Sequence, residues 1–185
     1  MSGGFRSRSA GRREDKPAHQ RNRQQGRGAA QQPRKQGGGR TRYTVKGRPA
    51  SIGDPAREAV FEVVLRVARD GAFANLTLPG ILRERKITGR DAAFATELAY
   101  GTLRSLGVLD AVIAKNASRE LERIAPEVLA ALRMGAYQLL YTRVGDHAAV
   151  DTSVRLVEAA GHEKAKGFAN GVLRSIARTP ADEWL

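Results

Sequence analysis

PEVLAALRMGAYQLLYTR, residues 126 to 143, is the stretch that decides the fold. Its apolar residues cover every face of a helical wheel, which predicts a helix buried on nearly all sides. Pro126 is placed for the first turn, where its missing N–H costs nothing, and Glu127 for the positive end of the helix dipole. Polar residues and a glycine interrupt the run before it reaches the roughly 18 apolar residues of a membrane span. The stretch therefore predicts the core helix of a soluble domain.

Further helices are predicted around this core helix, because apolar residues recur at helical spacing and no segment alternates as a strand does. The pair Asp54-Pro55 predicts an N-cap and a first-turn proline for the first helix, and Thr88 and Asp146 are predicted as caps of two later ones. The predicted helices cover residues 54–70, 76–86 with Pro79 in its first turn, 89–105, 108–118 after a break at Gly107, 126–143, 146–160 and 164–178. Joined by short loops, they predict an all-α fold, a compact bundle of about seven helices.

Charge is divided unevenly along the chain. Residues 1–50 contain 14 Lys and Arg against 2 Asp and Glu, whereas residues 51–185 contain 18 against 17. The first segment is also rich in Gly and Gln and nearly free of aliphatic residues, so residues 1–51 are predicted to form a disordered basic tail before a domain at 52–178. Such a composition is typical of flexible segments that bind RNA phosphates, and it also fits a solubilising tail without a defined partner.

Several classes of site are disfavoured by composition. The chain has no cysteine and three histidines, which excludes disulfides and thiolate metal sites and makes a zinc site an unfavoured prediction. With no apolar signal segment at the start, we expect a cytoplasmic protein with no membrane and no metal partner. Glu97, Asp110 and Asp151 fall on different predicted helices, so no catalytic residue is predicted. His147 and His162 lie beside helix ends, where a capping or surface role is expected.

The last predicted helix carries the candidate binding residues. Its sequence, KAKGFANGVLRS at 164–175, interleaves basic residues with an aromatic ring and an amide. This combination is typical of sites for single-stranded RNA, with ammonium groups on phosphate, the ring on a base and the amide on a base edge. The residues concerned are Lys164, Lys166, Phe168, Asn170 and Arg174. The alternative is that Phe168 is core and Asn170 caps a neighbouring loop.

Two further patterns lie near the end of the chain. The GxxxG spacing of Gly167 and Gly171 predicts close contact between helices. Residues 179–185 open like another helix, with Thr179 as cap and Pro180 in the first turn. We therefore expect a truncated linker helix toward a missing domain, and the alternative is a short terminal turn that docks Trp184 on the bundle.

A family resemblance rests on four segments in fixed order. These are DPAREAVFEVVLRV at 54–67, GRDAAFATELAYGTLRSLGVLDAVI at 89–113, APEVLAALRMGAYQLLYTRVGDHAAVDTSVRLVEAAG at 125–161 and KGFANGVLRSIA at 166–177. Together they resemble the NusB-like RNA-binding domain, over about residues 54–178. That family occurs as free transcription antitermination factors and as the N-terminal domain of the ribosomal RNA small subunit methyltransferase B family, which makes 5-methylcytosine in 16S rRNA.

The phrase FATEL at 94–98, Arg104 and Arg174 resemble the methyltransferase branch. The resemblance then implies ribosomal RNA, 16S or its precursor, as partner, together with a methyltransferase domain that is missing from this sequence. The resemblance implies S-adenosylmethionine as the cofactor of that missing domain. This sequence itself has no strand followed by a Gly-rich turn and no cysteine, so no cofactor is predicted to bind here. This chain is accordingly expected to bind RNA and not to methylate it.

The resemblance also implies RNA contact at the starts of the first and last helices. The matching positions are Arg57, with Arg48 just before it, and Lys166, Phe168 and Asn170. Three hypotheses remain open: the substrate-recognition domain of a 16S rRNA cytosine-5 methyltransferase, a stand-alone antitermination factor that binds rRNA leader RNA and a small-subunit ribosomal protein, and a protein-interaction bundle with an incidental basic tail.

Overall fold

The structure, a computed structural model, describes residues 50–185, and these form eight α-helices and two short 3₁₀ turns without a β-strand. In chain order the elements are α1 (Pro55–Asp70), α2 (Ala74–Glu84), α3 (Gly89–Arg104), α4 (Leu106–Asn116), η1 (Leu121–Arg123), α5 (Pro126–Tyr141), α6 (Asp146–Ala159), η2 (Glu163–Ala165), α7 (Lys166–Ala177) and α8 (Ala181–Trp184). The prediction of an all-α bundle is confirmed, and its seven predicted helices correspond to α1 through α7. No helix in this part of the chain is both long and apolar enough to cross a membrane.

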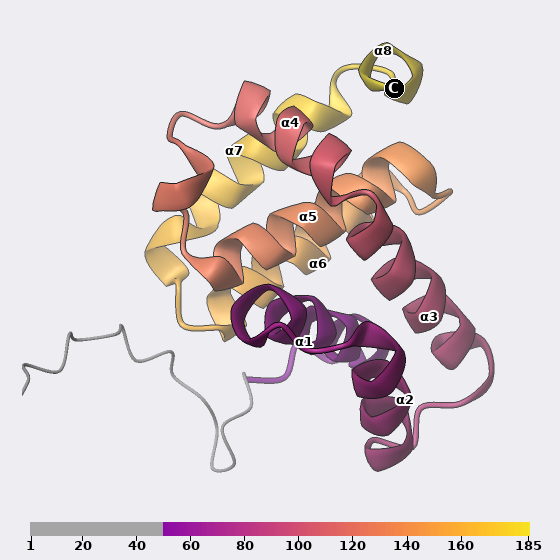
Figure 1. The fold of residues 1–185 in the computed structure, drawn as a ribbon. Helices are drawn as coiled ribbons and strands as arrows, with labels where there is room; N and C mark the ends of the chain where they lie inside the picture. Colours follow the sequence, from indigo (N-terminus) through magenta and orange to yellow (C-terminus); the bar gives the residue numbers. More distant parts are fainter. Residues whose placement is uncertain (1–49) are drawn as a thin grey trace, which may run out of the picture. The chain divides into compact units, whose positions relative to one another are not determined.

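Helix α5 lies at the centre, with α1, α3, α4, α6 and α7 packed around it (Figure 1). Eleven of its 16 residues are buried, so the prediction of a helix enclosed on nearly all sides is confirmed. It ends at Tyr141, two residues earlier than predicted, and that side chain is 40% exposed instead of lying in the core. Buried side chains such as Leu132 and Met134 fix the helix in place, since truncating one to alanine typically costs about 2–5 kcal/mol.

Two glycines allow neighbouring helices to approach α5 closely. A Cβ on Gly101 of α3 would overlap the ring of Tyr137, and one on Gly135 of α5 would lie 2.7 Å from Ser153 Oγ of α6. The predicted contact at Gly167 and Gly171 is wrong, because a Cβ added at either position meets nothing within 4 Å. The close helix contact is therefore made at Gly135, and the GxxxG face of α7 is open.

The observed helix starts confirm one of the capping residues predicted for α1, α3 and α6. The cap of α1 is confirmed, since Asp54 Oδ1 accepts a hydrogen bond of 3.1 Å from the backbone N–H of Arg57. Asp146 is not the cap of α6; the carbonyl of Gly145 already accepts a helical bond, so Asp146 is the first helical residue. Thr88 occupies the N-cap position of α3, but its side chain makes no capping hydrogen bond.

Two helices begin earlier than predicted. Helix α2 starts at residue 74 because the carbonyl of Phe73 accepts hydrogen bonds from both the backbone N–H and the hydroxyl of Thr77. Pro79 is consequently the sixth residue of the helix instead of lying in its first turn. Helix α4 starts at residue 106 because the carbonyl of Ser105 accepts its first bond, so Gly107 lies inside the helix and does not break it.

The two ends of the described chain are both attached to the bundle. The backbone N–H of Ala50 donates to the carbonyl of Ala159 at 3.3 Å, so residues 50 and 51, which were predicted to belong to the tail, already contact the domain. The predicted disorder of the rest of the tail falls on residues 1–49, which lie outside the described residues. At the other end Pro180, not Thr179, holds the N-cap position of α8, and Trp184 Nε1 donates to the carbonyl of Ile176 at 3.2 Å.

Candidate functional site

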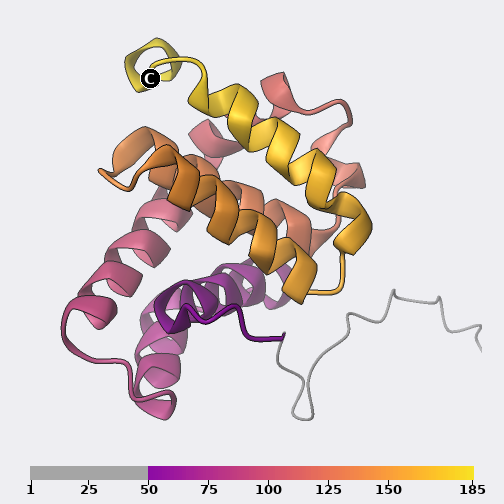
Figure 2. The ribbon, with the colours of Figure 1, turned by 180° about the vertical axis from the view of Figure 1, so that it is seen from behind.

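Five of the seven predicted RNA-binding residues lie together on η2 and α7, beside α6 (Figure 2). These five are Lys164, Lys166, Phe168, Asn170 and Arg174. Because residues four apart on a helix are neighbours, Lys166, Asn170 and Arg174 share one side of α7. Arg57 lies apart from them in sequence, on α1, and Arg48 lies outside the described residues.

The polar groups of this side are held by weak surface contacts. Lys166 Nζ lies 3.1 Å from Glu158 Oε1 of α6, and both side chains are at least one-third exposed, so the ion pair is readily exchanged for another anion. Asn170 Oδ1 accepts a hydrogen bond of 3.0 Å from Arg174 Nε, and Arg174 itself is exposed. Lys164 is exposed and forms no ion pair within residues 50–185. The side therefore offers cationic groups for an external anion.

Phe168, the aromatic residue among the five candidates, has a neighbour that the sequence did not predict. Phe168 is half-buried and packs against the core, so the two interpretations of this residue, core and binding surface, both apply in part. The guanidinium carbon of Arg119 lies over its ring, 4.2 Å from the centroid. Arg119 stands in the loop between α4 and η1, and it is exposed.

The face of α7 beside these side chains is bare backbone. Gly167 and Gly171 are both exposed, and no atom of the described chain lies where their Cβ atoms would be. Glycine inside a helix costs about 0.5–1 kcal/mol relative to alanine, and nothing within the domain requires it at these two positions. The bare face instead permits another molecule to approach the helix backbone closely.

Arg57 is engaged inside the domain. Its Nε donates to Gln138 Oε1 at 2.9 Å, its Nη1 lies 2.7 Å from Asp54 Oδ2, and its guanidinium lies 4.8 Å from the ring centroid of Phe94. Its side chain is 14% exposed, and Gln138 is fully buried. The side chain thus satisfies a buried amide of α5, and a contact of Arg57 with RNA stays a prediction.

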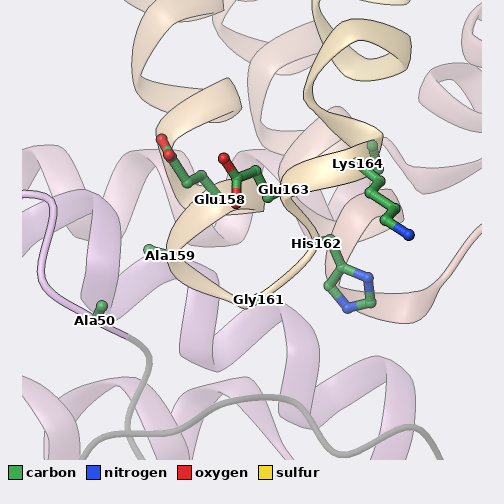
Figure 3. Close-up of a pocket in the computed structure, with 8 residues that line it drawn as sticks. Ala50, Glu158, Ala159, Gly161, His162, Glu163 and Lys164 are labelled. Atoms are coloured by element: carbon green, nitrogen blue, oxygen red, sulfur yellow. The ribbon is translucent and has the colours of Figure 1, made fainter.

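A hollow lies where the described chain begins. It is lined by Ala50, Glu158, Ala159, Gly161, His162, Glu163, Lys164 and Ala165. Figure 3 shows Lys164 and His162 on one side of it and the two glutamates on the other. Ala50, the first described residue, is hydrogen-bonded to Ala159 and therefore lies next to the turn that leads into α7.

Two buried or half-buried acids hold the helices together. Glu127 is buried and pairs with Arg69 of α1 and with His162, whose Nε2 lies 3.1 Å from Glu127 Oε2. His162 therefore links the turn before α7 to α5 in addition to standing beside a helix end. Asp110 receives two hydrogen bonds from Arg133, at 2.7 and 2.8 Å, which ties α4 to α5. Both acids have structural partners.

Comparison with known families gives a direct result: the model of the NusB family matches residues 54–178. The chain belongs to the NusB family. The boundaries agree with those of the resemblance, and all seven long helices of this NusB-family domain fall inside the match.

Longer proteins contain the same domain. A protein of Mycobacterium tuberculosis that is named as a putative methyltransferase is 52% identical over 132 residues, which cover 71% of this chain and 29% of that protein. Ribosomal RNA small subunit methyltransferase B of Escherichia coli O157:H7 is 34% identical over 122 residues, 66% of this chain and 28% of that enzyme. The chain thus spans less than one-third of the length of these relatives.

Solved structures share the fold. A crystal structure of the antitermination factors NusB and NusE in complex with double-stranded RNA matches with a TM-score of 0.61 and 27% identity, over 68% of this chain and 95% of the other. NusB of T. maritima matches with a TM-score of 0.64 at 23% identity, over 73% and 97%. The second likeness shows the fold alone.

Sequence reasoning missed Arg119. It is 49 residues away from Phe168 along the chain, and its own surroundings, a short charged loop, resemble an ordinary solvated turn. Only the packing of α4 against α7 brings the two side chains together. A charged residue in a loop carries no local signal of such a contact.

Proposed function

We propose that this NusB-family domain is the RNA-binding, substrate-recognition part of an S-adenosylmethionine-dependent 16S rRNA cytosine-5 methyltransferase. Two facts support the proposal. The relatives that carry the domain at 52% and 34% identity are named as methyltransferases, one of them of small-subunit ribosomal RNA. The domain also shares its fold with a NusB chain solved together with RNA.

The observation that carries the proposal is the composition of the outward surface of α7. Lys166, Asn170 and Arg174 stand in one row, Gly167 and Gly171 leave the adjoining face open, and Phe168 lies beyond these glycines, on the flank where Arg119 contacts it. Cations can bind phosphates, the ring can stack on a base and the amide can bind a base edge, which is how proteins hold single-stranded RNA. A backbone without side chains lets the sugar–phosphate chain come close.

Electrostatics assign different roles to the tail and the domain. Residues 51–185 are nearly balanced, with 18 Lys and Arg against 17 Asp and Glu, so the domain binds through a local cluster and not through a general positive field. Residues 1–50, with 14 against 2, supply the long-range attraction. Ala50, the last residue of this segment, lines the same hollow as His162 and Lys164.

Methyl transfer would be performed elsewhere in a longer protein. Residues 50–185 form helices joined by loops and contain no strand, so they offer no strand followed by a Gly-rich turn of the kind that holds S-adenosylmethionine. No catalytic step is therefore assigned to these residues. Their contribution is to bind and position the ribosomal RNA that the methyltransferase domain would modify.

A second candidate function is that of a stand-alone antitermination factor. It is favoured by the match to the NusB and NusE complex, which covers 95% of the aligned chain, so the domain corresponds to nearly a whole chain of that structure. The two functions predict different RNA preferences. A recognition domain prefers mature or precursor 16S rRNA, whereas an antitermination factor prefers leader RNA and binds it more tightly when its small-subunit ribosomal protein partner is added.

The test is a titration of the protein with single-stranded RNA fragments of 16S rRNA at several salt concentrations. Phe168→Leu, which keeps an apolar side chain but removes the ring, should weaken binding by the 1–3 kcal/mol typical of base stacking, roughly 5- to 150-fold, without changing the salt slope. Removing residues 1–49 should flatten the log–log salt slope by about 0.7 for each phosphate that the tail neutralises in the complex. Phe73→Leu is the matched control, because that ring is 71% exposed on the unrelated surface before α2.

Unchanged affinity in both Phe168→Leu and the shortened chain would refute the proposal and favour a protein-interaction bundle. Thermal unfolding of Phe168→Leu, measured beside the titration, separates weaker RNA stacking from damage to the fold.

A further inference from the structure

Arg119 lies outside η2 and α7, in the loop between α4 and η1, yet it contacts the one aromatic ring among the candidate RNA-binding residues. Its guanidinium carbon lies 4.2 Å from the centroid of the Phe168 ring. Arg119 is exposed while Phe168 packs against the core, so the guanidinium covers the solvent side of the ring. That side is the one on which an incoming base would stack.

Within the described residues the guanidinium of Arg119 forms no ion pair. Within residues 50–185 no carboxylate oxygen lies within ion-pair distance of it, whereas the nearby Arg123 pairs with Glu120 at 3.4 Å and Arg133 pairs with Asp110. A guanidinium has five N–H donors in a plane and stacks on flat π-systems, and here the ring is its only partner in the described chain. Its donors are therefore available to another molecule.

The loop that carries Arg119 is fixed to α7, although the side chain is long and exposed. Ser175 Oγ of α7 donates to Asn116 Oδ1 at 2.7 Å, and the backbone N–H of Ala117 donates to the carbonyl of Ile113 at 2.8 Å. The end of α4, three residues before Arg119, is thus held against the helix that bears Phe168 by the side chain of Asn116. The guanidinium can lift from the ring by side-chain rotation while the loop stays in place.

We propose that Arg119 is a further RNA-binding residue, which caps the base that stacks on Phe168. In the free protein the guanidinium occupies the place of the base; in the complex the base lies between the ring and the guanidinium. The inference rests on the proposed function, because it requires that Phe168 stacks on RNA. It adds a residue from a different part of the chain and assigns it to a base instead of to a phosphate.

Typical interaction energies favour the replacement of the Arg119 guanidinium by a base on the Phe168 ring. An exposed cation–π contact is weaker than the stacking of a base on an aromatic side chain, so a base can replace the guanidinium on the ring. The guanidinium then regains a π-surface by lying on the other face of the same base. A side chain that bound phosphate alone would have no reason to be placed over the ring.

The experiment compares Arg119→Ala, Arg119→Lys and Arg123→Ala in binding a single-stranded RNA 12-mer that contains 2-aminopurine, whose fluorescence is quenched when it stacks. Arg123→Ala removes the same charge from the same segment but no ring contact, so it is the matched control. We expect Arg119→Ala and Arg119→Lys each to weaken binding about fivefold, equivalent to about 1 kcal/mol, and to reduce the quenching. Arg123→Ala should change affinity less than twofold.

Three outcomes overturn the inference. Full affinity and quenching in Arg119→Lys would show a charge contact with phosphate, and equally weakened binding in Arg119→Ala and Arg123→Ala would show a general electrostatic effect. Unchanged binding in Arg119→Ala with weakened binding in Phe168→Leu would remove Arg119 from the site and leave the proposed function standing. If Phe168→Leu also binds normally, no base stacks on Phe168 and the inference fails with that contact; the proposed function itself fails only if the chain without residues 1–49 also keeps its affinity.

Discussion

Gly171→Ala is expected to make the protein more stable and its RNA binding weaker. Gly171 is the sixth residue of the 12-residue helix α7, its backbone is helical, and an added Cβ meets no atom within 4 Å. Alanine is favoured over glycine inside a helix by about 0.5–1 kcal/mol, so the free energy of unfolding should rise by that amount, and the melting temperature by roughly 2–4 °C. The same methyl group would stand on the face that we assign to RNA.

The weaker affinity follows from close packing. If the sugar–phosphate chain contacts the bare helix, an added methyl group forces a shift of the kind that costs about 1–3 kcal/mol in a packed interior, roughly 5- to 150-fold in affinity. Gly80→Ala in α2 is the matched control, because that Cβ also meets nothing within 4 Å and α2 carries none of the candidate residues. Urea unfolding and RNA titration of both variants measure the two effects.

The result that refutes this reasoning is equal RNA affinity in Gly171→Ala and Gly80→Ala, with both variants stabilised. RNA would then not approach the open face of α7. A decrease of stability in Gly171→Ala would instead show that the space at this position is not free.

Three further predictions concern the architecture around the site. Gly135→Ala should lower the free energy of unfolding in urea by about 1–3 kcal/mol, since its Cβ would crowd α6 and α7; an unchanged midpoint would contradict this. Arg57→Ala should lower the free energy of unfolding by about 1–3 kcal/mol, because it leaves the buried Oε1 of Gln138 without its donor. Arg57→Lys should recover little of this lost stability. Burial, with the charge of Glu97, raises the pKa of Tyr137 above its ordinary value of 10.0. The hydroxyl of Tyr137 therefore loses its proton at a lower pH in the unfolded chain than in the folded one, so the free energy of unfolding should fall as pH rises above about 10. Urea unfolding at pH 9 and 11 should show a smaller fall for Tyr137→Phe.

The fold was predictable because its main signal is local. Apolar residues on every face of the segment that becomes α5 indicate a central helix without any knowledge of its neighbours. Helix ends were predicted less well where a tertiary or backbone bond decides them: Gly107 was predicted as a break and Asp146 as a cap, yet the carbonyls of Ser105 and Gly145 already accept helical bonds.

The candidate site was likewise predictable only where its signal is local. Lys166, Phe168 and Asn170 lie within five residues, so their position on one helix is visible in the sequence. The partners of Arg57 and Arg119 could not be found, because Gln138 is 81 residues from the one and Phe168 is 49 residues from the other. Such contacts depend on how helices pack, which no local spacing encodes.

The most direct test of the central claim, that RNA binds on α7, is an NMR titration of backbone amides with a short single-stranded RNA. We predict that the largest shift changes fall on residues 164–174, with a second group at residues 117–120 around Arg119. Shift changes confined to the hollow lined by Phe94, Glu97, Tyr141 and Arg143, on the side formed by α3 and the end of α5, would contradict the account.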